Sequence, residues 1–472
     1  MLGLIALASV LLEGVSADRP VSGWPAIGNA AFPPYLGGNS PWFAGPNVNN
    51  ISPDVPDQCT VDMAAFVSRH GSRYPDPGSY STWTTLQSKI QNSSFEAHGP
   101  LAFIKDWEPV LQHPTAEVSQ ISVGGYRELY DMGTTYRWRY SHLYADNNPF
   151  IVWANRYQAY QPRVIDSARL FARGFIGPNA TTVGTIYVLN NSDPASLGNS
   201  LAVSDLCPTY NDTGGGVNAT TWANTYLPPI VKRINKLTTP PGAVNFTASD
   251  VALFGYLCGF ETQITGKTSP WCSVLTESEL KQYEYAQDIR YYYGAGPGAA
   301  KNGTFMLPFL QAIIERFQDG PNETYVSSDG SSFTPPPLIA AFTNDGQVNQ
   351  LAGVIGVFDD QAPLPATYIP AEQKFIASHY VTMRGTVSFE RLTCSGEQYV
   401  RVLLNDAVYP VVGCESGPGR SCPLAQYAQI VAQKQQAAGN FGTTCFGNAT
   451  TATGKTTFLT DLALPFMQAV KP

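Results

Sequence analysis

The sequence has few charged residues and no excess of positive charge. Only 14% of its 472 residues are Asp, Glu, Lys or Arg, and the formal net charge is −8. A nucleic-acid-binding protein needs a basic surface that replaces phosphate counterions, so the charge balance argues against this class. If the protein has an acidic ligand, a small local group of Arg side chains must bind it.

Several motifs and long apolar segments are also absent. The sequence contains no GxSxG, HExxH or Walker sequence, which argues against serine hydrolases, zinc proteases and nucleoside triphosphatases. No cysteine occurs in a CxxC pair, which disfavours a zinc or thioredoxin-like site. No run of about 18 apolar residues is present, so no membrane span is predicted. The apolar content of 43% and the aromatic content of 12% are ample for a folded core.

The first residues resemble a secretion signal. The run from residue 2 to residue 12 is largely apolar but too short to cross a bilayer, and Val15, Ser16 and Ala17 follow it as a small-x-small cleavage site. The positively charged start of a typical signal peptide is missing, and the alternative is a buried N-terminal strand or helix. We expect residues 1–17 to be a signal peptide.

Cysteines and sequons agree with a secreted glycoprotein. The cysteines form an even set, as expected in an oxidising compartment, and are Cys59, Cys207, Cys258, Cys272, Cys394, Cys414, Cys422 and Cys445. Asn-x-Ser/Thr sequons begin at Asn50, Asn92, Asn179, Asn190, Asn211, Asn218, Asn245, Asn302, Asn322 and Asn448. Attached sugars would also keep a chain with so few charges in solution.

Short apolar runs alternate with helical patterns along the chain, which is typical of an α/β fold. Buried strands are expected in the run that starts at Val61 and over residues 151–154, 186–189 and 338–342. Helices are expected over residues 125–140, 163–175, 250–261, 277–292 and 305–317. Two helices have capping-box patterns, Thr247-x-x-Asp250 and Thr276-x-x-Glu279. The predicted fold is an open, mostly parallel sheet flanked by helices, which binds its ligand at the carboxyl ends of the strands.

The same patterns predict how the chain is divided. Residues 18–58 are rich in Gly, Pro and Asn and are expected to form an extended N-terminal arm over the surface. The stretch from 195 to 300 contains helices and loops without convincing strands, which indicates an inserted helical cap. The predicted parts are an α/β catalytic domain at 59–80, 118–190 and 301–414, a mostly helical cap at 81–117 and 191–300, and a disulfide-tied C-terminal segment at 415–472.

The first predicted strand leads into the sequence RHGSRYP at residues 69–75. Arg69 and Arg73 flank His70, and Gly71 would let the backbone approach a ligand closely. An Arg guanidinium matches phosphate oxygens with its planar fork, and a His nitrogen is a nucleophile that can carry a phosphoryl group. The alternative is a surface turn that happens to be basic. Because the chain has only five histidines, a chance match is rare, and we interpret the motif as a phosphate site.

This heptapeptide and several later segments resemble the histidine acid phosphatases, a family that includes the fungal phytases. The later segments are PRVIDSA at 162–168, SPWC at 269–272, YEY at 283–285, YYY at 291–293, GPG at 296–298, FERLTC at 389–394 and SGPG at 416–419. The resemblance spans nearly the whole mature chain. It implies a phosphoglycerate-mutase-like fold with a helical cap, and hydrolysis of phosphomonoesters without a metal or other cofactor.

The resemblance also implies how the cysteines pair. Eight cysteines can pair in many ways, and the sequence alone leaves the choice open. The disulfides expected from the family are Cys59–Cys394, Cys207–Cys445, Cys258–Cys272 and Cys414–Cys422.

Arg163 is predicted from its own surroundings to bind an anion. Pro162 is a favourable first residue of a helix, so Arg163 lies in the first turn, where the helix dipole disfavours a cation. A bound anion would reverse this penalty, because helix N-termini and Arg side chains both bind phosphate. The alternative is an Arg side chain that extends into solvent. In the family, the matching segment carries the third phosphate-binding Arg.

The chain departs from the family at one position of the predicted site. Family members have a His-Asp pair after a later strand, in which the Asp donates a proton, and here the pair is Asn344 and Asp345. An Asn amide can donate a hydrogen bond to a phosphate oxygen, as His would, but it cannot titrate. The alternative is that both residues are ordinary N-caps of the following helix. The change is expected to affect phosphate affinity and pH profile more than the reaction itself.

Together these features predict a secreted acid phosphatase, located outside the cell, in the periplasmic space or in the cell wall. Its partner would be a small phosphomonoester, phytate included, held by Arg69, Arg73, Arg163 and Asn344. His70 would attack phosphorus with its pKa lowered by the Arg side chains, and Asp345 would protonate the leaving oxygen. The alternatives are a phytase of narrow specificity and a pseudoenzyme that binds phosphate esters without hydrolysing them. The histidines predicted to be structural are His98, His113, His142 and His379, the last in a strand region.

Overall fold

The computed structural model describes residues 24–27, 30–156, 162–447 and 454–472 of the chain. The predicted signal peptide at 1–17 and the sequon at Asn448 lie outside these residues. Within the described ranges, no helix is both long and apolar enough to cross a membrane.

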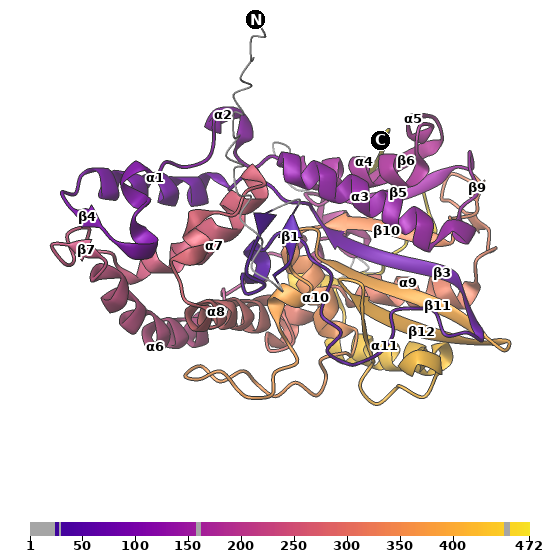
Figure 1. Ribbon diagram of the computed structural model, residues 1–472. Helices are drawn as coiled ribbons and strands as arrows, with labels where there is room; N and C mark the ends of the chain where they lie inside the picture. Colours follow the sequence, from indigo (N-terminus) through magenta and orange to yellow (C-terminus); the bar gives the residue numbers. More distant parts are fainter. Residues whose placement is uncertain (1–23, 28–29, 157–161, 448–453) are drawn as a thin grey trace, which may run out of the picture.

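A nine-stranded mixed sheet forms the centre of the molecule (Figure 1). Its adjacent parallel strands are, in order, β3 (Cys59–Arg69), β10 (Leu338–Thr343), β5 (Phe150–Arg156) and β6 (Gly184–Asn190). Antiparallel strands extend the two edges, and these are β11 (Thr386–Cys394), β12 (Glu397–Leu404), β13 (Ala407–Tyr409) and β14 (Cys422–Pro423) beyond β3, and β15 (Met467–Val470) beyond β6. The α/β fold and its parallel strands are confirmed, while the antiparallel edges were not predicted.

Helices cover both faces of the sheet (Figure 1). One face carries α3 (Val123–Arg139) and α4 (Arg163–Ile176), and the other carries α9 (Leu307–Asp319), α10 (Asp345–Val354) and α11 (Leu424–Ala438). All residues of β10 are buried between these layers, which explains its uninterrupted run of small and apolar side chains. Helices α3 and α4 cross at Gly133 and Gly174, where an added Cβ would lie 2.3 Å and 2.2 Å from a backbone oxygen of the other helix.

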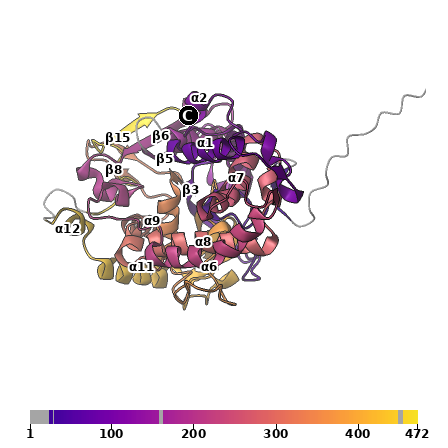
Figure 2. The ribbon, with the colours of Figure 1, turned by 90° about the vertical axis from the view of Figure 1, so that its left-hand side faces the viewer.

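Further helices pack together beside the sheet, on the left of Figure 1 and facing the viewer in Figure 2. They are α1 (Pro77–Gln91), α6 (Gly216–Asn235), α7 (Ala248–Thr265) and α8 (Glu277–Ala295). Helices α7 and α8 begin with the two predicted capping boxes, and both boxes are complete. The pairing of β4 (Glu96–Ala97) with β7 (Thr238–Thr239) joins the two stretches of chain from which the cap was predicted.

Part of the N-terminal arm is buried, which corrects the expectation that it lies over the surface. Phe32, Leu36 and Gly38 are buried. An added Cβ at Gly38 would lie 2.1 Å from the hydroxyl oxygen of Tyr291 on α8. The backbone of the arm therefore lies directly against this helix.

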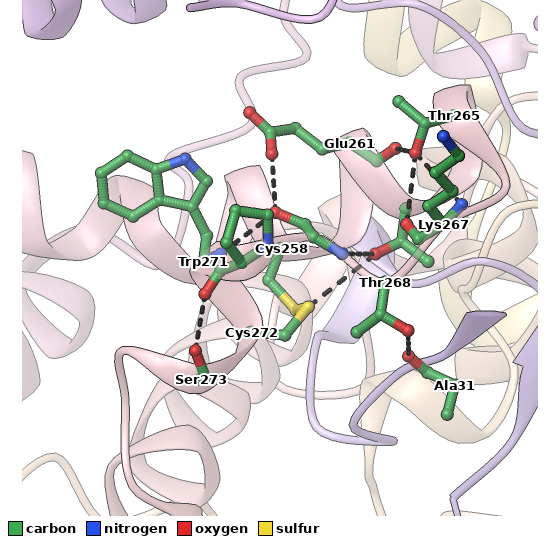
Figure 3. The surroundings of a disulfide bond; sticks show 12 residues. Ala31, Cys258, Glu261, Thr265, Lys267, Thr268, Trp271, Cys272 and Ser273 are labelled. Atoms are coloured by element: carbon green, nitrogen blue, oxygen red, sulfur yellow. Dashed lines mark hydrogen bonds between the residues drawn. A yellow bond between two sulfur atoms is a disulfide. The ribbon is translucent and has the colours of Figure 1, made fainter. Parts of the chain in front are cut away.

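All of the predicted disulfides are present, namely Cys59–Cys394, Cys207–Cys445, Cys258–Cys272 and Cys414–Cys422. Cys59 and Cys394 lie opposite each other in the antiparallel pairing of β3 with β11. Cys258–Cys272 ties α7 to the following 3-10 helix, η7 (Pro270–Ser273), and the nearby Thr268 hydroxyl donates to the carbonyl of Ala31 at 2.8 Å (Figure 3). The same region thus anchors both α7 and the arm.

Removing the Cys59–Cys394 disulfide should lower the free energy of unfolding by about 2–5 kcal/mol, because this bond closes a loop with a sequence separation of 335 residues. The measurement is urea unfolding of the double variant Cys59→Ala/Cys394→Ala. Cys414→Ala/Cys422→Ala is the control, since its bond has a sequence separation of only 8 and should contribute less. A larger loss in the control would contradict the chain-entropy argument.

Candidate active site

The predicted site lies where β3 and β10 end. Thr343 pairs with Arg69 in the parallel register of these strands, so the residues that follow each strand meet at one edge of the sheet. The amide of His70 donates to the carbonyl of Thr343 at 3.1 Å, which fixes the first turn after β3. Parallel strands thereby place the RHGSRYP sequence beside Asn344 and Asp345, as the sequence predicted.

His70 is buried, and its ring is held in one tautomer. Its Nδ1 lies 2.9 Å from the carbonyl oxygen of Gly71. A carbonyl oxygen can only accept, so we assign the ring proton to Nδ1, and Nε2 keeps its lone pair. Burial lowers the pKa of His70 well below its usual value, and the guanidinium groups of the three site arginines lower it further. The ring therefore stays a neutral nucleophile in acid.

Arg69 is held so that one edge of its guanidinium is left for a ligand. Its Nη1 donates to the carbonyl oxygens of Gly38 at 2.5 Å and of Val381 at 2.8 Å. Its Nη2 lies 3.6 Å from Oδ2 of Asp345, and the buried Nε has no partner among the described residues. An edge of this kind suits two oxygens of a phosphoryl group.

The two other arginines share one carboxylate that sequence analysis did not predict. Asp76 lies between them, with Oδ2 at 2.9 Å from Nη2 of Arg73 and Oδ1 at 3.1 Å from Nη1 of Arg163. Arg163 is the first residue of α4 and is buried, so the alternative of an Arg extending into solvent is wrong. Asp76 directly follows the heptapeptide, and that position was the only signal for it.

Asn344 occupies the N-cap position of α10 but does not cap the helix with its side chain. Its amide nitrogen and oxygen are both buried and have no hydrogen-bond partner in the described part of the chain. A buried amide without partners is costly, and its nitrogen can donate to an anion beside it. The interpretation as a mere N-cap residue loses its support, since the capping hydrogen bond is not made.

Asp345 opens α10 and belongs to the same cluster. The hydroxyl of Tyr291 donates to its Oδ2 at 2.8 Å. Burial acts to raise the pKa of Asp345, but the charges of Arg69 and Arg290 and the Tyr291 hydrogen bond outweigh burial and hold the pKa well below its usual range. About a third of its side chain, 34%, remains exposed, so a substrate can reach it.

A buried carboxylate on α3 positions the loop of the heptapeptide. Glu128 accepts hydrogen bonds of 2.7 Å from both the backbone amide and the hydroxyl of Ser72. An added Cβ on Gly71 would lie 2.1 Å from Leu129 of the same helix. Glycine at this position thus allows close packing against α3. Glu128 was not predicted, because an isolated Glu in a helix carries no local signal.

The other histidines lie apart from this cluster. Nε2 of His98 is 2.8 Å from the Thr239 hydroxyl, and Nε2 of His142 is 2.5 Å from the Val61 carbonyl. His379 lies in the 3-10 helix η9 (Ala377–His379), not in the strand region that was predicted. Among the described residues, no group of three His, Cys, Asp or Glu side chains is arranged to hold a metal ion.

Comparison with known proteins places the chain in a family. The Histidine phosphatase superfamily (branch 2) profile matches residues 60–405. Acid phosphatase PHO1 of Komagataella pastoris is 31% identical over 407 residues, which cover 83% of this chain and 82% of that protein. Phytase PHO112 of Candida albicans is 27% identical over 408 residues, covering 85% and 84%. A crystal structure of the phytase from D. castellii matches with a TM-score of 0.81 and 26% identity, covering 92% of this chain and 91% of that one. The chain therefore belongs to the histidine acid phosphatases, branch 2 of the histidine phosphatase superfamily.

Proposed function

We propose that this phosphoric monoester hydrolase is a secreted acid phosphatase that acts on phosphomonoesters, phytate included, through a phosphohistidine intermediate on His70. The observation that carries the proposal is a neutral, buried imidazole grouped with three guanidinium groups at one sheet edge. Beside it, Nε of Arg69 and the amide nitrogen of Asn344 are buried donors without a partner in the described part of the chain. Such a site satisfies a phosphoryl dianion and offers it a nitrogen nucleophile.

The first step follows from the tautomer of His70. The phosphoryl oxygens are held by Arg69, Arg73, Arg163 and the amide of Asn344. Nε2 of His70 then attacks phosphorus in line with the ester oxygen, forming a P–N bond as the P–O bond breaks. Nδ1–H of His70 donates a hydrogen bond to the carbonyl of Gly71 throughout, which stabilises the positive charge that develops on the ring.

Asp345 supplies the proton for the leaving oxygen. In the ligand-free arrangement the neighbouring Arg69 favours the carboxylate form of Asp345. A phosphoryl group bound to Arg69 brings negative charge to the same place and raises the pKa of Asp345, so the acid form is populated at low pH. After the alcohol leaves, Asp345 takes a proton from water as that water attacks phosphorus, the P–N bond breaks, and phosphate is released.

Secretion and glycosylation form part of the proposal. The disulfides support an oxidising compartment, and the apolar segment at 1–17 supports a signal peptide. The described sequon asparagines are exposed or half-buried, as oligosaccharide attachment requires, and they are Asn50, Asn92, Asn179, Asn190, Asn211, Asn218, Asn245, Asn302 and Asn322. We also propose that the helices α1, α6, α7 and α8 form the cap and that the sheet with its covering helices forms the catalytic domain.

His70→Ala should abolish phosphate release from p-nitrophenyl phosphate and from phytate at acid pH, with a loss of several orders of magnitude. Wild type quenched in acid after reaction with labelled substrate should contain an acid-labile phosphoprotein, and the variant should not. His98→Ala is the control and should keep full activity. An active wild type that forms no phosphoenzyme would contradict the covalent route. Activity of wild type on phytate alone would favour a phytase of narrow specificity. A wild type without activity on either substrate would favour the pseudoenzyme.

Asp345→Asn should damage catalysis according to the basicity of the leaving group. Sugar and inositol phosphates release strongly basic alkoxides that need a proton, so they should lose more kcat than p-nitrophenyl phosphate does. The exposed Asp131→Asn on α3 serves as the control. An equal loss on all substrates would mean that Asp345 supports the pocket without donating a proton.

Asn344→Ala should lower kcat/KM by roughly one to two orders of magnitude, the scale of a lost hydrogen bond to a charged group. Asn344→His should remain active and bind phosphate more tightly at the acid end of the pH range, where the imidazole is cationic, and lose this gain as it deprotonates. Both variants are measured from about pH 3 to 7. Unchanged activity of the Ala variant would remove Asn344 from the phosphate site.

A further inference from the structure

The position of Arg69 depends on two stretches of backbone that are distant in sequence. Its Nη1 is fixed by the carbonyls of Gly38 in the N-terminal arm and of Val381, just after η9. The carboxylate of Asp345 lies 3.6 Å from Nη2 on the other side of the guanidinium. The placement of Arg69 therefore depends in part on the arm and the η9 segment.

Two acidic side chains on α8 hold both of these stretches. Oε2 of Glu284 accepts from the amide of Gly37 at 2.7 Å, and Oε1 accepts from the amide of Ser378 at 2.9 Å. Oδ1 of Asp288 accepts from the amide of Ala377 at 2.7 Å. Glu284 and Asp288 are one helical turn apart, so one face of α8 clamps the arm and the η9 segment together.

Both carboxyl groups are buried, with 5% of Glu284 and 2% of Asp288 exposed. They also line a cavity of about 840 Å³ between the arm, α8 and the η9 segment. The ionisable groups around the pair from these three elements are Lys281, Tyr283 and Tyr285 on α8, Tyr35 in the arm, and His379 and Tyr380 at the η9 segment. Lys281 is engaged with Glu277 at 2.8 Å, and burial lowers the pKa of His379 to about 4, so neither is placed to neutralise a second negative charge.

We propose that Glu284 and Asp288 are positioning residues that link protonation of the cap helix to the placement of Arg69, so that phosphate binding weakens as the pH rises. The inference rests on the proposed role of Arg69 in binding phosphate. It adds to that role a second pH dependence, separate from the titration of His70 and Asp345.

The electrostatics of the pair set the direction of the effect. Burial raises the pKa of Glu284 to about 6, and burial together with the Glu284 charge raises the pKa of Asp288 well above its usual value. Each group thus binds its proton more tightly in the folded site than in an unfolded chain, so rising pH weakens the folded arrangement and falling pH strengthens it. With both groups ionised, two negative charges would face each other in a buried place, which favours release of the clamped backbone.

The variant Asp288→Asn tests the link, because an amide keeps an acceptor for Ala377 and cannot ionise. Its KM for p-nitrophenyl phosphate should match the wild-type KM within about twofold near pH 5, and should be lower by roughly threefold or more near pH 7.5, with kcat similar at both. At each pH the KM of the variant is divided by the KM of wild type, which cancels any pH dependence that the two proteins share. Glu277→Gln removes an exposed charge on the same helix, and its ratio should not change with pH. A ratio for Asp288→Asn that does not change with pH overturns the proposal.

Hydrogen exchange of wild type gives a second measurement that needs no catalysis and no substitution. After correction for intrinsic rates, the protection of the Gly37, Ala377 and Ser378 amides should fall by roughly tenfold between about pH 5 and 7.5. Constant protection overturns the link even in an active phosphatase. A fall in protection in a chain without phosphatase activity would support the link and reject the proposed function, so the two failures are distinguishable.

Discussion

Three guanidinium groups converge on one buried imidazole, and the rest of the site balances this positive charge. Asp76 joins Arg73 to Arg163, while backbone carbonyls and Asp345 surround Arg69. Burial lowers the pKa of His70, and the charges of Arg163, Arg69 and Arg73 lower it further, so the imidazole stays neutral. The same positive charges make the surroundings of the imidazole suited to a phosphoryl group.

The scaffold holds these charges in place through backbone and side-chain contacts together. The parallel register of β3 and β10 sets which residues meet, and Glu128 anchors the loop that follows β3. The close crossing of α3 and α4 at Gly133 and Gly174 then fixes where α4 begins, and with it the position of Arg163. A displacement of one helix would move the loop and the third arginine together, so their relative geometry is preserved.

Much of the fold could be predicted from local patterns, because buried strands and capped helices leave periodic and capping signals. The strands at 151–154 and 338–342 were found within a few residues of their bounds. Helix α6 was missed because Pro228 and Pro229 interrupt its pattern. The antiparallel edge beyond β3 was missed although β11 and β12 contain the Val, Phe, Tyr and Thr residues that favour strands.

The candidate site was predictable where its residues follow strands and match a motif, as for His70. The residues that complete it were not. Asp76, Glu128 and Tyr291 act through contacts with groups that are close in space, and an Asp, Glu or Tyr at such a position looks like any other in the sequence. The buried part of the arm was mispredicted for the same reason, because its Gly and Pro content also suits an exposed loop.

The disulfide between Cys59 and Cys394 has a topological consequence. It joins two neighbouring strands at the edge of the parallel sheet, yet the chain between its ends includes both helical stretches of the predicted cap and nearly every residue of the candidate site. A protease that cut a single exposed loop anywhere in that stretch would not release a fragment, since the two pieces would stay covalently joined. In electrophoresis a nicked molecule would therefore migrate as one species until its disulfides are reduced. The sheet that carries His70 would still be covalently joined to its helices.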